Sequence, residues 1–123
     1  MRCFDHERMD VYRRALEFIR IAATIRQKLV PGHAALADQL ERAAVSIALN
    51  IAEGAGEFAR KEKARFYRIA RRSATESAAV LDVVHALELA EERQISIGKT
   101  QLIEIVGSLV GLGKRIEGGT KLG

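Results

Sequence analysis

The stretch QLERAAVSIALNIAEG, from Gln39 to Gly54, decides the fold of this chain. Its apolar side chains occupy both sides of a helical wheel. One side carries Leu40, Ala43, Ile47 and Ile51 and extends back to Leu36, just before the stretch, and the back carries Ala44, Ala48, Leu49 and Ala52. A helix that is apolar on nearly every side is surrounded by protein. We therefore predict a helix over residues 33–53 that packs inside a bundle on one side and against another subunit on the other.

Periodic apolar residues predict three further helices around this one. A helix over 5–29 has a seam that ends at the breaker Val30-Pro31-Gly32. The Gly54-Ala55-Gly56 break precedes a long helix over 60–92, and Ser96 is a candidate cap for a helix over 98–117. The expected core positions are Val11, Ala15, Phe18, Ala22, Ile25 and Leu29, then Phe66, Ile69, Ser73, Val80, Val84 and Leu87, then Leu102, Ile105, Val106, Leu109, Leu112 and Ile116.

Length and composition agree with one helical domain. The chain has 123 residues, of which 48% are hydrophobic and 29% charged, with one proline and no tryptophan. This composition excludes intrinsic disorder and favours helices over a many-turned β-sandwich. We predict an all-α fold, an antiparallel up-down-up-down four-helix bundle that forms a single domain over 1–123, with residues 118–123 as a loose tail. Gly107, Gly111 and Gly113 weaken the last helix, and close helix contact is the expected compensation.

The sequence predicts a cytoplasmic protein without catalytic residues. Cys3 can form no internal disulfide, the N-terminus lacks an apolar signal segment, and we expect no membrane span. Cys3 also lacks an evident catalytic partner, and Asp82-Val83-Val84-His85 is a single acid-x-x-His, with His85 expected on an outer face. We predict no enzyme activity, no metal site and no cofactor.

Glu76 lies on the flank of the apolar stripe of the 60–92 helix, where an unpaired buried carboxylate would be unfavourable. The preferred interpretation is a pair inside the bundle with Arg42, Ser46 or Asn50. A ligand-binding or catalytic carboxylate, acting with Glu53, and simple exposure are the alternatives.

The strongest asymmetric feature is a basic segment. Residues 60–72 contain seven Lys or Arg and one Glu, a charge of +6, whereas the whole chain carries +4. Four of these cations share one helix face, and Arg13 and Arg20 lie on the outer side of the 5–29 helix. We define the basic row as Lys61, Arg65, Arg68 and Arg72. Its charges predict either phosphate contacts or a face neutralised by acids of another helix or subunit.

The Gln39–Gly54 stretch closely resembles the signature of the four-helix-bundle proteins encoded in intervening sequences of bacterial 23S ribosomal RNA genes. FYRIARRSATE, residues 66–76, resembles the pattern of their third helix, and the helix order agrees over about residues 5–117. Leu49 stands where a small residue is common, and Gly56-Glu57-Phe58-Ala59 replaces a more polar turn. The matched signature positions are Arg42, Ser46, Asn50 and Glu53, then Arg72, Ser73 and Glu76.

The resemblance implies a cytoplasmic bacterial bundle that assembles as a ring-like homopentamer and has no established catalytic activity. It also implies a relation to accessory proteins of diversity-generating retroelements, which bind nucleic acid and a reverse transcriptase through a basic surface. We therefore expect a non-enzymatic homo-oligomeric scaffold that binds RNA or DNA through phosphate contacts. The alternative is a protein-interaction module for an acidic partner or a reverse transcriptase, with no direct nucleic-acid role.

Overall fold

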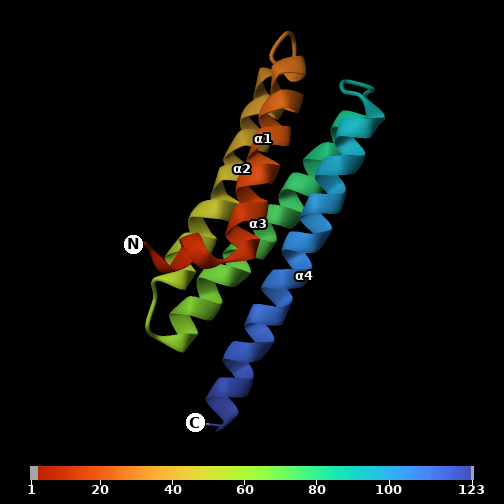
Figure 1. The fold of residues 1–123 in the computed structure, drawn as a ribbon. Coiled ribbons are helices and arrows are strands. Elements are labelled where there is room, and N and C mark those ends of the chain that lie inside the picture. The colour runs from red at the N-terminus through yellow and green to blue at the C-terminus, as the bar shows by residue number, and fades with distance from the viewer. Residues whose placement is uncertain (1–2, 123) are drawn as a thin grey trace.

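The computed structural model describes the backbone of residues 3–122 and the side chains of residues 3–118 (Figure 1). A short 3-10 helix, η1 (Asp5–Arg8), precedes four α-helices, and the described residues contain no strand. The α-helices are α1 (Asp10–Leu29), α2 (Ala34–Ala55), α3 (Arg60–Ala86) and α4 (Glu92–Leu122). The predicted all-α fold with four helices is therefore confirmed.

Each long helix packs against two others, so the four close into a bundle. Both α1 and α3 contact α2 and α4, which leaves α1 and α3 diagonally opposite. Ion pairs connect α1 to α4 near both ends of α1. Arg14 Nη1 lies 2.6 Å from Glu104 Oε2, and Lys28 Nζ lies 3.7 Å from Glu91 Oε1, just before α4. These two ion pairs hold α1 beside α4 and the turn that precedes it.

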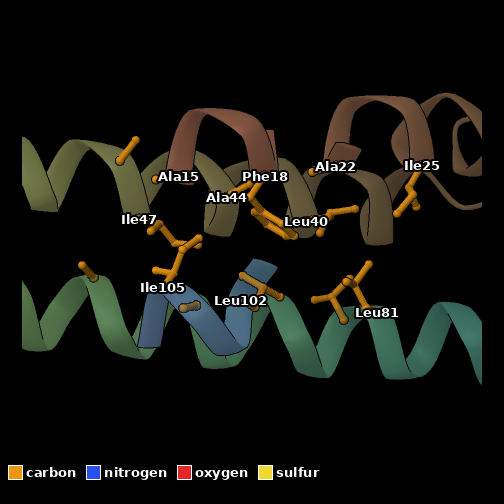
Figure 2. Packing of buried hydrophobic residues seen from close by; sticks show 14 of the residues in the cluster. Ala15, Phe18, Ala22, Ile25, Leu40, Ala44, Ile47, Leu81, Leu102 and Ile105 are labelled. Atoms are coloured by element: carbon orange, nitrogen blue, oxygen red, sulfur yellow. The ribbon is translucent and has the colours of Figure 1, made fainter. Parts of the chain in front are cut away.

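The core lies along the axis of the bundle, where all four helices contribute side chains (Figure 2). All six predicted core positions of α1 are buried, and so are Leu40, Ala43, Ile47 and Ile51 of α2. Ala44 and Ala48, on the back of α2, are also buried, whereas Leu49 is 60% exposed. The predicted core face of α2 is therefore confirmed apart from the half-buried Leu36, whereas Ala44 and Ala48, expected on the side toward another subunit, lie in the core of the single chain.

The predicted core face of α3 is partly wrong. Ser73, Val80 and Val84 are buried as expected, but Phe66 and Ile69 are only half-buried and Leu87 is exposed. The buried face is centred on other residues: Tyr67, Ala70, Ala74, Ser77 and Leu81. Alanine and serine gave a weak hydrophobic signal, although their small side chains allow α3 to pack closely against its neighbours.

The predicted boundary between the last two helices is also wrong. α3 ends at Ala86 instead of continuing to residue 92, and α4 begins at Glu92, so Ser96 lies inside a helix and caps nothing. Glu88 makes the turn with a φ of 55°, and Leu89 N–H donates to Val84 O at 3.0 Å. Leu89 and Ala90 then pack partly against the core, which favours this turn although it contains no glycine or proline. The expected loose tail is helical through Leu122, and Gly123 lies outside the described residues.

The glycines in close contact are not those that the sequence predicted. A Cβ added to Gly107, Gly111 or Gly113 would meet no heavy atom within 4 Å. A Cβ on Gly98 would lie 3.1 Å from Leu81 Cδ1, and one on Gly54 would lie 2.6 Å from Tyr67 Cε1. Gly54 also belongs to α2, which ends one residue later at Ala55.

By length and composition alone, α4 is apolar enough over Glu92–Gly118 to cross a membrane, and the expectation of no membrane span stays a prediction. Some of the apolar residues of α4 serve the bundle core, since Leu102, Ile105 and Leu109 are buried there. Within the tested window, 28% of the residues are buried.

Candidate functional site

The basic row lies on the side of α3 that faces away from the core. Lys61, Arg65, Arg68 and Arg72 are all exposed, as their common helix face predicts. Among residues 3–118, Lys61, Arg68 and Arg72 have no hydrogen bond or ion pair from their side chains. Three of the four predicted cations therefore present uncompensated charge to solvent.

Arg65 differs from the other members of the row because it already has partners on its own helix. Its Nε lies 3.2 Å from Glu62 Oε1, and its Nη2 donates to Glu62 Oε2 at 3.2 Å. Its guanidinium also lies 4.8 Å from the centre of the Phe66 ring. A surface pair at this spacing contributes only a few tenths of a kcal/mol (~0.3–0.5), so Glu62 weakens the charge of Arg65 without sequestering it.

Lys63 has a structural role within the same basic segment. Its Nζ donates to Gly54 O at 2.7 Å and to Ala55 O at 3.2 Å. These carbonyls belong to the last turn of α2, where backbone acceptors lack helical partners and a cation is favourable. Lys63 therefore joins the end of α2 to the beginning of α3.

The two arginines predicted on the first helix are not beside the basic row. Arg13 and Arg20 are exposed on α1, which lies diagonally across the bundle from α3. Arg13 Nη2 is 2.7 Å from Asp10 Oδ1, whereas the side chain of Arg20 has no such partner among the described residues. On a single chain, Arg13 and Arg20 therefore lie on a surface separate from the basic row.

The signature residues divide into a connected group and an exposed group. Ser46 Oγ of α2 and Ser73 Oγ of α3 share a hydrogen bond of 2.8 Å, and Asn50 Nδ2 donates to Ser46 Oγ at 3.1 Å. Asn50 Nδ2 also donates to Ser46 O at 2.9 Å, and the buried Ser77 Oγ donates to Ser73 O. We call Ser46, Asn50 and Ser73 the serine–asparagine network, which fixes α2 against α3.

The predicted internal pair of Glu76 is wrong for the single chain. Glu76 is exposed and, within the described part of the chain, makes no hydrogen bond or ion pair. Each helical residue advances by ~100°, which places Glu76 well away from the face that Ala74 and Ser77 bury. Arg42 and Glu53 are exposed as well, and no contact brings Glu53 to Glu76 for acid–base chemistry. Of the predicted partners, Ser46 instead bonds to Ser73, and Asn50 donates to Ser46.

A groove between α3 and α4 was not predicted from the sequence. It has a volume of about 290 Å³ and is lined from α3 by Ala64, Tyr67, Arg68 and Arg71 and from α4 by Leu109, Val110, Gly113, Lys114 and Glu117. Burial raises the pKa of the Tyr67 phenol, which lines one wall of the groove. Only Arg68 of this lining was assigned to a site from the sequence. Finding Lys114 requires the register between two helices, which one sequence does not contain.

Within the described residues, no group of His, Cys, Asp and Glu is arranged to hold a metal ion. Cys3 is an exposed free thiol that accepts a hydrogen bond from Arg8 Nε at 3.2 Å. His85 is exposed, as its place on the outer face of α3 predicts.

Comparison with known proteins supports the family. No curated protein is significantly similar to this chain. A crystal structure of a protein of unknown function from the S23 ribosomal protein family of Bacteroides thetaiotaomicron has a similar fold, with a TM-score of 0.79 at 24% identity. The match covers 85% of this chain and 98% of that one. The family described as "23S rRNA-intervening sequence protein" matches residues 7–111. The chain therefore belongs to the 23S rRNA-intervening sequence protein family.

Proposed function

We propose that this protein is a cytoplasmic, non-enzymatic scaffold that binds nucleic acid through phosphate contacts from the basic row. In this proposal the chain is an antiparallel up-down-up-down bundle, and several copies assemble into a homo-oligomer, most simply a pentamer. The name of the family, which refers to sequences within 23S ribosomal RNA genes, is consistent with a nucleic-acid partner.

The observation that carries the proposal is that three of the four cations of the basic row have no counter-ion among the described residues, whereas Arg65 pairs with Glu62. Lys61, Arg68 and Arg72 extend over three turns of α3, and within residues 3–118 their charged groups have no acidic partner. Cations at this spacing repel one another unless a polyanion or an acidic protein neutralises them. A phosphate backbone supplies regularly spaced negative charge and releases counterions when it binds.

Support for self-association comes from exposed apolar side chains. Leu49 of α2 is 60% exposed beside the half-buried Val45, and Phe58 in the α2–α3 turn is 99% exposed. Removing these side chains from water would stabilise a subunit interface. Several copies would also repeat the basic row, and linked sites increase avidity without new contacts.

The test is a salt series with a double variant, Arg68→Gln with Arg72→Gln. We expect the affinity for duplex DNA to fall with salt, with a slope near −0.9 for each phosphate contacted. The double variant should flatten that slope by about two units and weaken binding equally for unrelated sequences. Arg93→Gln is the matched control, because Arg93 is an exposed arginine at the opposite end of α4 from Lys114.

Light scattering on the same variants separates this proposal from its alternatives. Unchanged assembly with weakened binding supports nucleic-acid contacts. Loss of assembly would mean that the arginines pair with another subunit. Wild-type protein without salt-sensitive affinity for DNA or RNA would reject the proposal and favour a module for an acidic protein partner, such as a reverse transcriptase.

A further inference from the structure

The groove between α3 and α4 differs from the rest of the basic surface because it combines cations with an apolar hollow. Its volume of about 290 Å³ is close to the lower limit of ~300 Å³ for ligand pockets. It therefore has room for a ligand group of about the size of one nucleotide, and is too small for a stacked base pair.

The rim of this groove carries uncompensated positive charge. Arg68 and Arg71 of α3 and Lys114 of α4 line it, opposed by the single acid Glu117. In the described part of the chain, the side chains of these three cations have no hydrogen bond or ion pair. Two separate helices thus direct cations to one place, whereas the other members of the basic row lie along one helix. Such convergence favours an anionic group seated between the helices.

The wall and floor of the groove are apolar and open. Leu109 is buried, Val110 and Ala64 are half-buried, and Gly113 contributes no side chain. A Cβ added to Gly113 would meet no heavy atom within 4 Å, so the missing side chain leaves free space and serves no helix contact. Tyr67 also lines the groove, and its phenol is uncharged at neutral pH, as an ordinary tyrosine is.

We propose that this groove seats one unpaired nucleotide of a nucleic-acid strand. The phosphate lies against Arg68, Arg71 and Lys114, and the base and sugar lie over Val110 and Gly113. The inference rests on the proposed nucleic-acid binding and adds a site and a substrate class, namely single-stranded segments or loops. A duplex offers phosphates to the same cations but keeps its bases stacked, so it leaves the hollow empty.

The experiment measures fluorescence anisotropy with labelled oligonucleotides of about 15 nucleotides, single-stranded and as a duplex of the same sequence. Gly113→Leu fills the hollow without a change of charge, and the open space around Gly113 accommodates the new side chain. We expect this variant to bind the single strand about fivefold more weakly, which is the lower end of the effect of losing one base contact. Binding to the duplex should change less than twofold.

Gly107→Leu is the matched control. Gly107 lies in the same helix, is equally open, and is not part of the groove lining. Both substitutions raise helix propensity, so neither should lower the melting temperature. Ala64→Leu fills the hollow from α3 and should reproduce the loss, which guards against a misfolded Gly113→Leu protein.

The outcomes separate this inference from the proposed function. If wild type binds but Gly113→Leu and Ala64→Leu bind single strands as wild type does, the nucleotide site is wrong while phosphate binding by the basic row stands. Equal losses for single strand and duplex would likewise overturn it. If wild type binds no oligonucleotide at all, both the nucleotide site and the proposed function are wrong, and an acidic protein ligand becomes the better occupant of the groove.

Discussion

The ring of Tyr67 lies against the backbone of Gly54, so close that a Cβ at Gly54 would be 2.6 Å from Tyr67 Cε1 and 2.8 Å from Cδ1. This contact joins the last turn of α2 to the second turn of α3. Lys63 reinforces it by donating to Gly54 O. The glycine that ends the signature stretch is therefore required by packing, although it lies inside a helix.

The first prediction tests that contact with Gly54→Ala. Alanine is favoured over glycine within a helix by about 1 kcal/mol, but here its methyl group would collide with a buried ring. Overpacking of this kind lowers the free energy of unfolding by about 1–3 kcal/mol. Urea titration should therefore show a net loss for Gly54→Ala. The control is Gly107→Ala, where space is open and stability should rise; equal behaviour of the two variants would contradict the packing argument.

The second prediction concerns the serine–asparagine network. Ser73→Ala removes the partner of Ser46 Oγ at a partly buried position, while Asn50 still donates to that oxygen. The free energy of unfolding should fall by about 1–2 kcal/mol. Thr75→Ala, at an exposed position of α3, should change it by less than about 0.5 kcal/mol. If calorimetry shows that Ser73→Ala is as stable as wild type, the serine–asparagine network does not stabilise the fold.

The third prediction is that Glu76→Ala leaves the stability of the isolated chain nearly unchanged. Glu76 is exposed and, among the described residues, has no partner that its loss would leave unsatisfied. Surface substitutions of this kind stay within about 0.5 kcal/mol. A thermal melt checks the fold, and light scattering checks assembly. A large drop in melting temperature together with dissociation would place Glu76 at a subunit interface.

The positions of the helices could be predicted from the sequence, but the boundary between α3 and α4 could not. Val11 through Leu29 repeat an apolar residue every third or fourth position, and that spacing alone placed a correct core face on α1. The turn at Glu88 has no such signal, because a glutamate with positive φ is stabilised by the burial of Leu89 and Ala90 after it. Tertiary packing decided that boundary.

The candidate site was likewise predictable in part. The basic row was predictable because its members share one helix face, which depends only on spacing. The partners of individual side chains could not be predicted, because they depend on how the helices pack. Lys63 bonds to α2 carbonyls, and Glu76 is exposed to solvent. The α3–α4 groove joins Arg71 with Lys114, a pair that only the packing of two helices brings together.

The fourth prediction is a pH dependence that Tyr67→Phe removes. In the unfolded chain a tyrosine ionises near pH 10, whereas burial raises the pKa of Tyr67 in the folded protein. Well below pH 10 the folded and unfolded states both keep the Tyr67 proton, so Tyr67 contributes no pH dependence to the free energy of unfolding. Above pH 10 the unfolded state loses the proton first, so the free energy of unfolding falls. Tyr67→Phe should resist this alkaline loss better than wild type in urea titrations at pH 9 and near pH 11; an equal loss in both proteins would argue against it.

The fifth prediction concerns assembly through the exposed side of α2. Leu49 is the large apolar side chain on that side, beside the half-buried Val45, and a lysine there would place a charge in any interface that covers it. We expect Leu49→Lys to convert the wild-type oligomer to smaller species in light scattering, with helical content unchanged by circular dichroism. Val30→Lys is the control, because Val30 is also an exposed apolar residue but follows α1 at the other end of the bundle from Gly54. Since avidity depends on linked copies, the dissociated Leu49→Lys protein should also bind nucleic acid at least tenfold more weakly, although its basic row is intact. A wild-type protein that is already monomeric, or a Leu49→Lys protein that stays fully assembled, would refute this interface.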